Sequence, residues 1–321
     1  MKNEMFETII KTLKTVFRHP SYFIIILNKM GLPILNDRAY IDISFKIKLG
    51  RKPDLDNPQT FNEKLQWLKL NDRDSSYTTM VDKYEVKGYV ANILGEKYII
   101  PTIGVYDRFE EIDFDSLPDQ FVMKCTHDSG GLVIVRDKAK LNINKARRKI
   151  NKSLKRNYYY PGREWPYKNV KPRIIIEKYM VDDKSKELKD YKYFCFNGKP
   201  EIILTCSERF SKDGLRETWF DSEWNLLPIT EGGHEIDESI KRPKKFKEMS
   251  RLAKKLSNGI AFVRIDFYEI DGKVYFGEIT FFPASGFERF DPGEWDKKLG
   301  EMIDLSVLMK KQRNGSKDEK D

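Results

Sequence analysis

Cysteine and histidine are scarce, with only three of each among the 321 residues of this chain. No two cysteines form a Cys-x-x-Cys pair, and each lies in an apolar or strand-like run where free thiols commonly pack. The three histidines lie too far apart in the sequence to place two imidazoles on one helical face. We therefore expect neither a disulfide framework nor a zinc site. The three thiols belong to Cys125, Cys195 and Cys206.

Long hydrophobic runs are also missing. The longest, from Tyr22 to Leu27, is broken by Asn28 and Lys29, and the wider stretch is too short to cross a bilayer. No small-residue cleavage site follows an apolar segment near the N-terminus, so the sequence does not indicate a secretory signal. We expect a cytoplasmic protein without a membrane span.

Basic residues exceed acidic ones, which gives a formal net charge of +9 and favours anionic partners. Part of this charge lies among apolar residues near the N-terminus, at Lys11, Lys14 and Arg18. This basic amphipathic start predicts a helix that packs on the body of the protein. Peripheral contact with the inner face of the membrane is the alternative.

Helical and strand patterns alternate along the chain, which predicts an α+β fold. Thr60 followed by Glu63 and an apolar periodicity forms a capping box that opens a helix, and a second helix is expected from Met80 to Leu94, ending at Gly95. Further helices are expected at Asn144 to Arg156 and Pro243 to Leu256. Strands are expected at Phe121 to Cys125, Leu132 to Val135, Arg173 to Lys178, Tyr191 to Phe196, Glu201 to Cys206, Phe262 to Ile270 and Val274 to Thr280.

Three short segments predict hairpins, because glycine and its neighbours tolerate the positive φ of tight turns. They are Ser129-Gly130-Gly131, Asn197-Gly198 and Asp271-Gly272.

The last hairpin carries the strongest chemical signal, Arg264-x-Asp266 on one strand and Glu278-x-Thr280 on the next. Two carboxylates on neighbouring strands can hold Mg²⁺, and Arg264 shares the strand face of Asp266, where it can bind phosphate. A surface hairpin with scattered charge is the alternative.

The register of this hairpin decides between those alternatives. With a regular two-residue turn, Asp266 pairs with Gly277 and Glu278 points to the opposite face. A shared metal therefore requires a bulge or a longer loop between the two carboxylates, and we predict that irregularity.

Two further segments offer groups for a nucleotide. Lys124 on a strand, followed by the small-residue loop Ser129, Gly130 and Gly131, supplies a cation and backbone N–H groups for phosphates. The loop lacks the Walker pattern, and a plain hairpin turn is the alternative. The strand that ends in Glu177, Tyr179 and Met180 offers an apolar contact to adenine, although alone it is an ordinary buried strand.

The order of these segments resembles the ATP-grasp superfamily. Longer motifs resemble its teichuronopeptide-biosynthesis branch, called TupA-like: Pro58-x-Thr60-Phe61-Asn62-Glu63-Lys64-Leu65-Gln66-Trp67-Leu68, Asp190-Tyr191-Lys192, Phe196-Asn197-Gly198-Lys199 and Phe276-Gly277-Glu278-Ile279-Thr280. This similarity extends from about Lys48 to Leu305. It implies an ATP-grasp fold in which two α/β lobes clasp ATP, with a helical N-terminal extension.

The resemblance also implies roles for individual residues. Lys87 and Lys124 contact ATP phosphates under a loop that includes Ser129, Gly130 and Gly131. Glu177, Tyr179 and Met180 hold adenine, Asp190 lies near the ribose, and Arg264 faces the phosphates. Asp266, Glu278 and Thr280 bind Mg²⁺, although many relatives have Asn where this chain has Thr280, which weakens the case for a second metal.

The implied chain organisation has four parts. Residues 1–80 form the helical extension and the start of the N-terminal subdomain, 81–178 the small nucleotide-binding lobe, 179–309 the C-terminal lobe with the metal site, and 310–321 a disordered tail.

The implied activity is ligation of a carboxylate to an amine through an acyl phosphate. Its expected setting is the synthesis of acidic cell-surface polysaccharide, with an amino acid and an acidic sugar as partners. For the acceptor we single out the aromatic and basic segment that contains Arg163, Trp165 and Tyr167.

Two other functions are compatible with the sequence. A glycosyltransferase could use an Asp-x-Asp pair, and three occur, at Asp54, Asp72 and Asp113, although none ends an apolar strand. A polyanion-binding protein could use the basic stretch between Lys145 and Arg156. We read that stretch as a solvated helix face or a contact for an acidic glycan, and we expect no nucleic acid.

Overall fold

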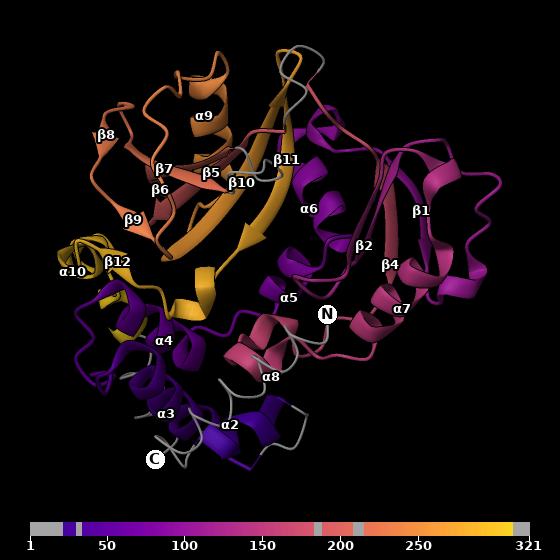
Figure 1. The fold of residues 1–321 in the computed structure, drawn as a ribbon. Coiled ribbons are helices and arrows are strands. Elements are labelled where there is room, and N and C mark those ends of the chain that lie inside the picture. The colour runs from indigo at the N-terminus through magenta and orange to yellow at the C-terminus, as the bar shows by residue number, and fades with distance from the viewer. Residues whose placement is uncertain (1–21, 30–33, 183–187, 208–214, 311–321) are drawn as a thin grey trace.

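Two antiparallel sheets lie side by side, with α5 (Ser76–Val81) and α6 (Glu85–Leu94) between them (Figure 1). The computed structural model describes residues 22–29, 34–182, 188–207 and 215–310. The basic start of the chain and most of the expected tail therefore lie outside the described residues. The fold is α+β, as the alternating patterns predict.

The smaller sheet has four strands in the order β1-β4-β2-β3. Its outer face is covered by α7 (Ile143–Leu154), where Ala146 and Ile150 pack with Phe121 and Met123. Side chains alternate along a strand, so Lys124 points to the opposite face, toward the other lobe. The strands are β1 (Thr102–Tyr106), β2 (Phe121–Cys125), β3 (Leu132–Val135) and β4 (Ile174–Lys178).

The larger sheet has six strands in the order β11-β10-β5-β6-β7-β8. One face is covered by α9 (Phe246–Leu256), whose Phe246 packs beside Tyr193. The strands are β5 (Asp190–Phe196), β6 (Lys199–Ser207), β7 (Arg216–Asp221), β8 (Leu226–Leu227), β10 (Phe262–Ile270) and β11 (Lys273–Thr280). A separate pair is formed by β9 (Thr230–Glu231) and β12 (Phe290–Asp291).

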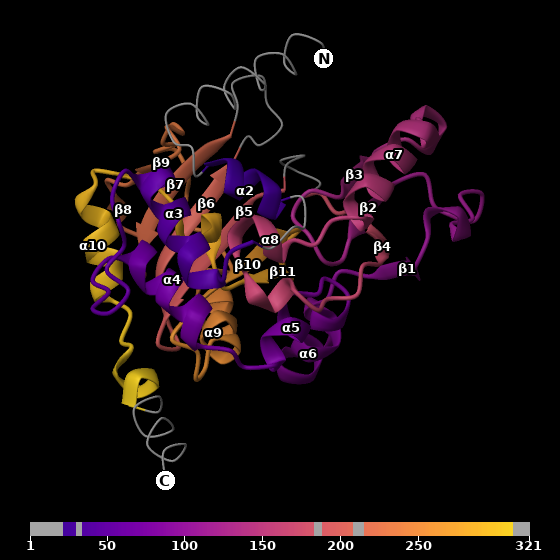
Figure 2. The same cartoon turned by 90° about the horizontal axis from the view of Figure 1, so that it is seen from below.

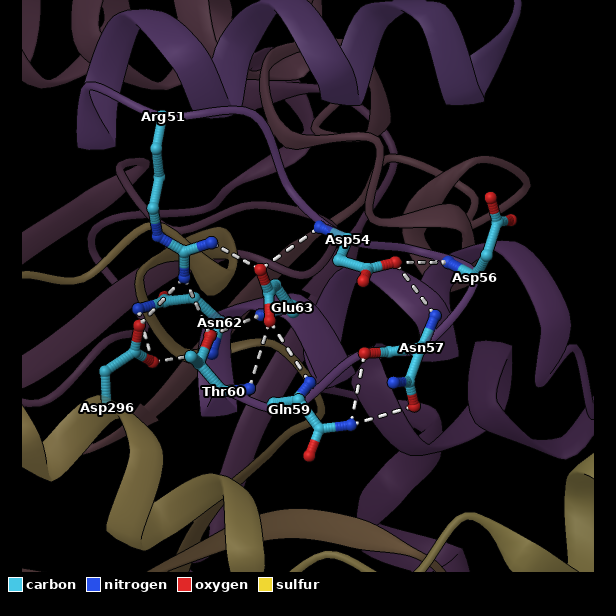
Figure 3. A network of polar contacts seen from close by, with 9 residues as sticks. All are labelled: Arg51, Asp54, Asp56, Asn57, Gln59, Thr60, Asn62, Glu63 and Asp296. Carbon is cyan, nitrogen blue, oxygen red and sulfur yellow. Dashed lines mark hydrogen bonds and ion pairs between the residues drawn. The ribbon is translucent and has the colours of Figure 1, made fainter.

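The other face of this sheet is covered by α4 (Phe61–Asn71), whose Phe61 ring lies edge-on to Phe262, 4.9 Å between centroids. The capping box at Thr60 and Glu63 is confirmed. Figure 3 shows how Glu63 accepts hydrogen bonds from the main-chain N–H groups of Asp54, Gln59 and Thr60. These bonds fix the angle at which the chain enters α4.

The same network joins α4 to α10 (Glu294–Glu301) near the end of the described chain. Asp296 accepts the main-chain N–H of Asn62 at 2.9 Å and lies 3.6 Å from Arg51. A Cβ on Gly300 would lie 2.3 Å from the carbonyl oxygen of Gln59, so only glycine allows α10 to approach the chain this closely. The start of α4 and helix α10, which are far apart in sequence, thus pack together on one side of the large sheet.

Helix α3 (Asp37–Leu49) packs against α4, and α2 (Tyr22–Lys29) packs against α3 and α8 (Tyr159–Gly162) (Figure 2). Short 3-10 turns occur at η1 (Glu96–Tyr98), η2 (Phe109–Glu111), η3 (Lys138–Lys140), η4 (Trp165–Tyr167) and η5 (Pro283–Gly286). No helix among the described residues is long and apolar enough to cross a membrane.

The prediction of one helix from Met80 to Leu94 was wrong, because the chain breaks at Asp82. The Asp82 side chain accepts the main-chain N–H groups of Tyr84 at 2.8 Å and Glu85 at 3.3 Å. This local bond competes with the helical ladder, so α5 ends at Val81 and α6 starts at Glu85. The predicted stop at Gly95 is confirmed.

All seven predicted strands and all three predicted hairpins are present, with ends that differ by two residues at most. The sequence patterns did not predict β1, β7, β8, β9 or β12, which are short or begin beside polar residues.

Candidate functional site

A bulge in β11 brings the predicted metal-binding side chains together. The turn at Asp271-Gly272 has the two residues of a regular hairpin, since Ile270 pairs with Lys273. The register then shifts, and Asp266 pairs with Glu278, leaving Gly277 as the extra residue. The predicted irregularity is confirmed, and both carboxylates lie on one face of the sheet.

Arg264 joins these carboxylates. Its Nε donates to Asp266 Oδ1 at 2.7 Å, and one terminal nitrogen reaches Asp266 Oδ2 and Glu278 Oε1, each at 2.8 Å. The same nitrogen lies 3.1 Å from the Thr280 hydroxyl. The four residues singled out on this hairpin therefore form one cluster.

Lys192 on β5 extends the cluster across the sheet. Its ammonium donates to Asp266 at 2.6 Å and to Asp190 at 2.5 Å. Burial disfavours the ammonium, but Asp190 and Asp266 raise the pKa of Lys192 above its ordinary value. The expected ribose contact Asp190 thus lies beside the metal-binding candidates. Lys192 was not predicted as a site residue, although its spacing of two from Asp190 places both on one strand face.

Glu278 is the member of the cluster that faces the gap between the lobes. Burial disfavours its charge, but Arg264, Lys83, Lys192 and Lys124 more than offset this and lower the pKa of Glu278 to about 2. Glu278 is therefore ionised at neutral pH.

The small lobe presents a second charged cluster. Glu177 on β4 accepts from Lys124 at 2.7 Å and also pairs with Lys87, whose ammonium donates to the carbonyl oxygen of Ile100 at 2.7 Å. Burial disfavours the Glu177 carboxylate, but Lys124 and Lys87 lower its pKa. The expected adenine contact Glu177 lies between the two expected phosphate contacts.

The two clusters line one cavity. It has a volume of about 40 Å³ and is bordered by Lys83, Lys87, Lys124 and Glu177 on one side and by Tyr268, Phe276, Gly277 and Glu278 on the other. The lysines of one lobe therefore face Glu278, one of the metal-binding candidates of the other.

The loop from Thr126 to Gly131 is fixed at the edge of this region. Asp128 accepts the main-chain N–H of Gly131 at 3.1 Å and the hydroxyl of Ser153, while Lys83 donates to the Asp128 carbonyl at 2.5 Å. A Cβ on Gly131 would lie 2.6 Å from the Cys125 sulfur, so this position requires glycine. Gly130 has open space around it.

Tyr179 lies at the far end of β4, apart from the lysine cluster. Its hydroxyl is 3.3 Å from Arg136, and it borders a cavity of about 920 Å³ that does not include Glu177. Met180 follows it, half-buried.

The proposed acceptor segment divides into two parts. Arg163 is 1% exposed and donates to the Leu35 carbonyl at 3.3 Å, and its guanidinium lies over the Tyr40 ring at 4.4 Å. Trp165 donates to the carbonyl oxygen of Asp72 at 3.1 Å. Both side chains anchor the segment to the helices around it, which differs from the expectation that they contact a substrate.

Tyr167 lies on the side of the segment that faces the charged cluster. Burial raises the pKa of its hydroxyl, and Glu164 and Glu278 add to this effect. Tyr158 packs edge-on against it, with 4.9 Å between centroids.

Three glutamates form an acidic group that was not predicted, because they come from separate segments. Burial raises the pKa of Glu231 to about 9, and the charges of Glu217 and Glu288 contribute. The positive charge of Arg264 opposes this shift, so the group lies on the Arg264 side of the large sheet.

The Asp-x-Asp pairs serve local structure. Asp54 and Asp113 each accept the main-chain N–H of the aspartate two residues on, at 3.2 and 3.1 Å. Asp74 accepts the main-chain N–H of Ser76 at 2.9 Å. These contacts are typical of turns, so they give no support to a glycosyltransferase.

Comparisons with known proteins support one family. Residues 63–304 match the family described as TupA-like ATPgrasp. No curated protein matches the chain.

Among solved structures, D-alanine–D-alanine ligase from Bacillus anthracis, complexed with ATP, is 19% identical, with a TM-score of 0.42, over 74% of this chain and 68% of that chain. The Helicobacter pylori enzyme is 14% identical, with a TM-score of 0.38, over 70% and 63%. The biotin carboxylase domain of 2-oxoglutarate carboxylase from Hydrogenobacter thermophilus is 14% identical, with a TM-score of 0.37, over 63% and 40%.

Proposed function

The chain belongs to the TupA-like ATP-grasp family, and we propose that it uses Mg²⁺-ATP to activate a carboxylate as an acyl phosphate, which an amine then captures. Family membership makes it an ATP-dependent carboxylate–amine ligase. The observation that carries the mechanistic proposal is the cavity between the lobes, where Lys87 and Lys124 face Glu278, which Arg264 joins to Asp266.

Lys87 and Lys124 bind the phosphates of ATP in this proposal. Both now pair with Glu177, whose pKa they lower, so each is a cation held within the cavity. Phosphate oxygens can replace the Glu177 carboxylate as their partner. Ser129, Gly130 and Gly131 cover the phosphates, and Glu177, Tyr179 and Met180 are assigned to the adenine end.

The chemistry of the donor set fits Mg²⁺. Among the described residues, no three His, Cys, Asp or Glu side chains gather closely enough to hold a metal by themselves. Mg²⁺ commonly takes one or two carboxylates and completes its shell with phosphate oxygens and water. Asp266 and Glu278 supply those carboxylates, with Thr280 beside them, and the bound ion would neutralise phosphate charge.

The reaction then needs no side-chain nucleophile. A substrate carboxylate oxygen attacks the γ-phosphorus, the bond to the β-phosphate oxygen breaks, and ADP leaves. The amine nitrogen then attacks the acyl carbon, inorganic phosphate leaves, and the nitrogen loses a proton. Arg264 and Lys124 stabilise the negative charge on the transferring phosphoryl group.

The substrates assigned to this reaction are an amino acid and an acidic sugar or polysaccharide, in the synthesis of acidic cell-surface polymer. The assignment rests on analogy with the family. Tyr167 is the residue of the acceptor segment best placed for it, because its hydroxyl feels the charge of Glu278, whereas Arg163 and Trp165 anchor the segment to the helices around it.

The decisive experiment supplies the purified protein with ATP, Mg²⁺ and a panel of amino acids and uronic acids. We expect ADP release that depends on both a carboxylate and an amine. With a carboxylate labelled with oxygen-18, the label should appear in the released phosphate. AMP release, or phosphate without label, would exclude the acyl-phosphate route.

A further inference from the structure

Strand β3 forms one edge of the small sheet, since the strand order ends there and no described strand pairs with its outer side. The main-chain N–H of Cys125 donates to the carbonyl of Gly131 at 2.7 Å, so these residues form a bonded pair of the β2–β3 ladder. Bonded and non-bonded pairs alternate in an antiparallel ladder. The N–H and C=O groups of Ile134 therefore point away from β2.

These outward groups border a groove between β3 and α7. It has a volume of about 730 Å³, and six consecutive residues, Leu132 to Asp137, line one wall. The other wall is made by residues of η3 and α7: Lys140, Leu141, Asn142, Lys145, Ala146 and Lys149. Figure 2 shows β3 and α7 together at the far end of the small lobe.

The groove is strongly basic. Arg136, Lys140, Lys145 and Lys149 line it, and the single acidic side chain, Asp137, already pairs with Lys140 at 2.8 Å. Lys145 and Lys149 are one helical turn apart, about 6 Å along the axis. Alternate side chains of an extended peptide repeat at about 6.6 Å, so successive acidic residues on one face of a strand match this spacing.

We propose that this groove binds an acidic polypeptide segment in extended conformation, which pairs with the outer edge of β3 while its carboxylates meet the lysines of α7. Only another polypeptide main chain can continue a β-ladder, which favours a peptide over a glycan. None of the residues that line the groove is aromatic, so the groove lacks the platforms on which nucleic-acid bases and sugars stack.

The lysines of the groove are separate from those of the candidate active site. Ala146 and Ile150 of α7 pack on the sheet face that carries Met123, whereas Lys124 and Glu177 lie on the opposite face. Arg136 and Asp137, at one end of the groove, also border the cavity beside Tyr179. A peptide held by Lys145 and Lys149 would therefore leave the cavity between the lobes open. The proposal does not depend on the proposed reaction.

The test measures binding of the full chain to fluorescein-labelled oligo-L-glutamate by fluorescence anisotropy, with oligogalacturonate and a single-stranded oligonucleotide as the other probes. Lys145→Glu with Lys149→Glu should weaken peptide binding by at least about tenfold. Lys152→Glu with Lys155→Glu makes the same charge change at the C-terminal end of α7, outside the groove, and should change the affinity less.

Ile134→Pro tests the main-chain contact, because it removes an outward N–H without removing a bond to β2. Peptide binding should fall, while the melting temperature and ADP release remain close to those of the unchanged protein. If Ile134→Pro prevents folding, Ile134 N-methylation by semisynthesis or the charge-reversal pair decides the question.

Equal affinity for the glycan or the oligonucleotide, or equal loss in the two charge-reversal pairs, would overturn the proposal. Loss of ADP release in the groove variants would also overturn it, because the groove would then belong to the catalytic site.

Discussion

Asp266 and Glu278 face each other across β10 and β11, yet their surroundings differ. The Asp266 side chain is 1% exposed and accepts hydrogen bonds from both Arg264 and Lys192, whereas the Glu278 side chain is 41% exposed. An amide at Asp266 would leave each of two cations with one carboxylate partner, Asp190 for Lys192 and Glu278 for Arg264. From the sequence alone both positions serve the metal equally, but the structure gives Asp266 a second role in stability.

We expect both Asp266→Asn and Glu278→Gln to abolish Mg²⁺-ATP turnover, with different effects on folding. Asp266→Asn should cost about 1–3 kcal/mol of stability, because it weakens buried charge-assisted hydrogen bonds from Arg264 and Lys192. Glu278→Gln should cost about 1 kcal/mol or less. Thermal denaturation and ADP release measure the two effects. Normal turnover in Glu278→Gln would remove Glu278 from the metal site.

The pKa of Glu231, raised to about 9, predicts a pH dependence of stability. In the folded protein Glu231 keeps a proton that the unfolded chain releases at its ordinary pKa of 4.5. The folded state therefore binds more protons across this range, and stability falls as pH rises from about 4.5 to about 9.

Glu231→Gln should remove this fall in stability at higher pH, because glutamine does not titrate. Near pH 8 the variant should gain on the order of 1 kcal/mol, which corresponds to about 2–4 °C in Tm, and near pH 5 it should gain little. Glu238→Gln, an exposed change on the same segment, is the control. Identical melting of wild type and Glu231→Gln at both pH values would show that the acidic group costs no stability.

Among the elements, the β11 bulge decides whether the site exists. A Cβ on Gly277 would lie 3.0 Å from the Asp266 carbonyl oxygen and 3.1 Å from the Tyr268 ring. Either the bulge or the neighbouring strand must shift to accept a side chain there. Gly277 thus allows a two-residue turn and a shared face for both carboxylates.

Gly277→Ala should lower kcat on the order of tenfold, because it displaces Asp266 relative to Glu278. Its melting temperature should change little. Deletion of Gly277 removes the extra residue and leaves Glu278 opposite Asp266 in a regular ladder, so the shared face and measurable turnover should remain. Steady-state ADP release checks both variants. An unchanged kcat in Gly277→Ala would show that the bulge does not set the position of Asp266, and a folded deletion variant without turnover would show that the shared face does not suffice.

At the scale of the whole molecule, local sequence patterns predicted the strands and hairpins better than they predicted contacts between distant segments. Hydrophobic alternation and turn residues sufficed to predict the longer hairpin strands, although not strands such as β7. The strand period of two, together with the assumption of a shared metal, sufficed to predict the bulge. The burial of Arg163 could not be predicted this way, because its partners Leu35 and Tyr40 lie more than 120 residues away. Lys192 likewise gains its role only when β5 and β10 are adjacent.

The two lobes lie close together where Lys124 faces Glu278. The cavity between Lys124 and Glu278 has about 40 Å³, whereas small-molecule sites occupy about 300–1,000 Å³. Lys87 and Lys124 are held by Glu177, and Arg264 is held by Glu278. ATP must therefore widen the gap between the lobes as its phosphates replace these carboxylate partners.

Spin labels at Asp115→Cys in the small lobe and Lys199→Cys in the large lobe would report this movement. Both positions are exposed, and the three native cysteines are buried, so the labels should attach selectively. We expect ATP with Mg²⁺ to shift the label-to-label distance to longer values by a few ångströms, measured by double electron–electron resonance. The same labels with Lys124→Ala should require more ATP for the shift, because that variant lacks one phosphate contact. If saturating ATP leaves the distance unchanged or shortens it, ATP does not enter by separating the lobes.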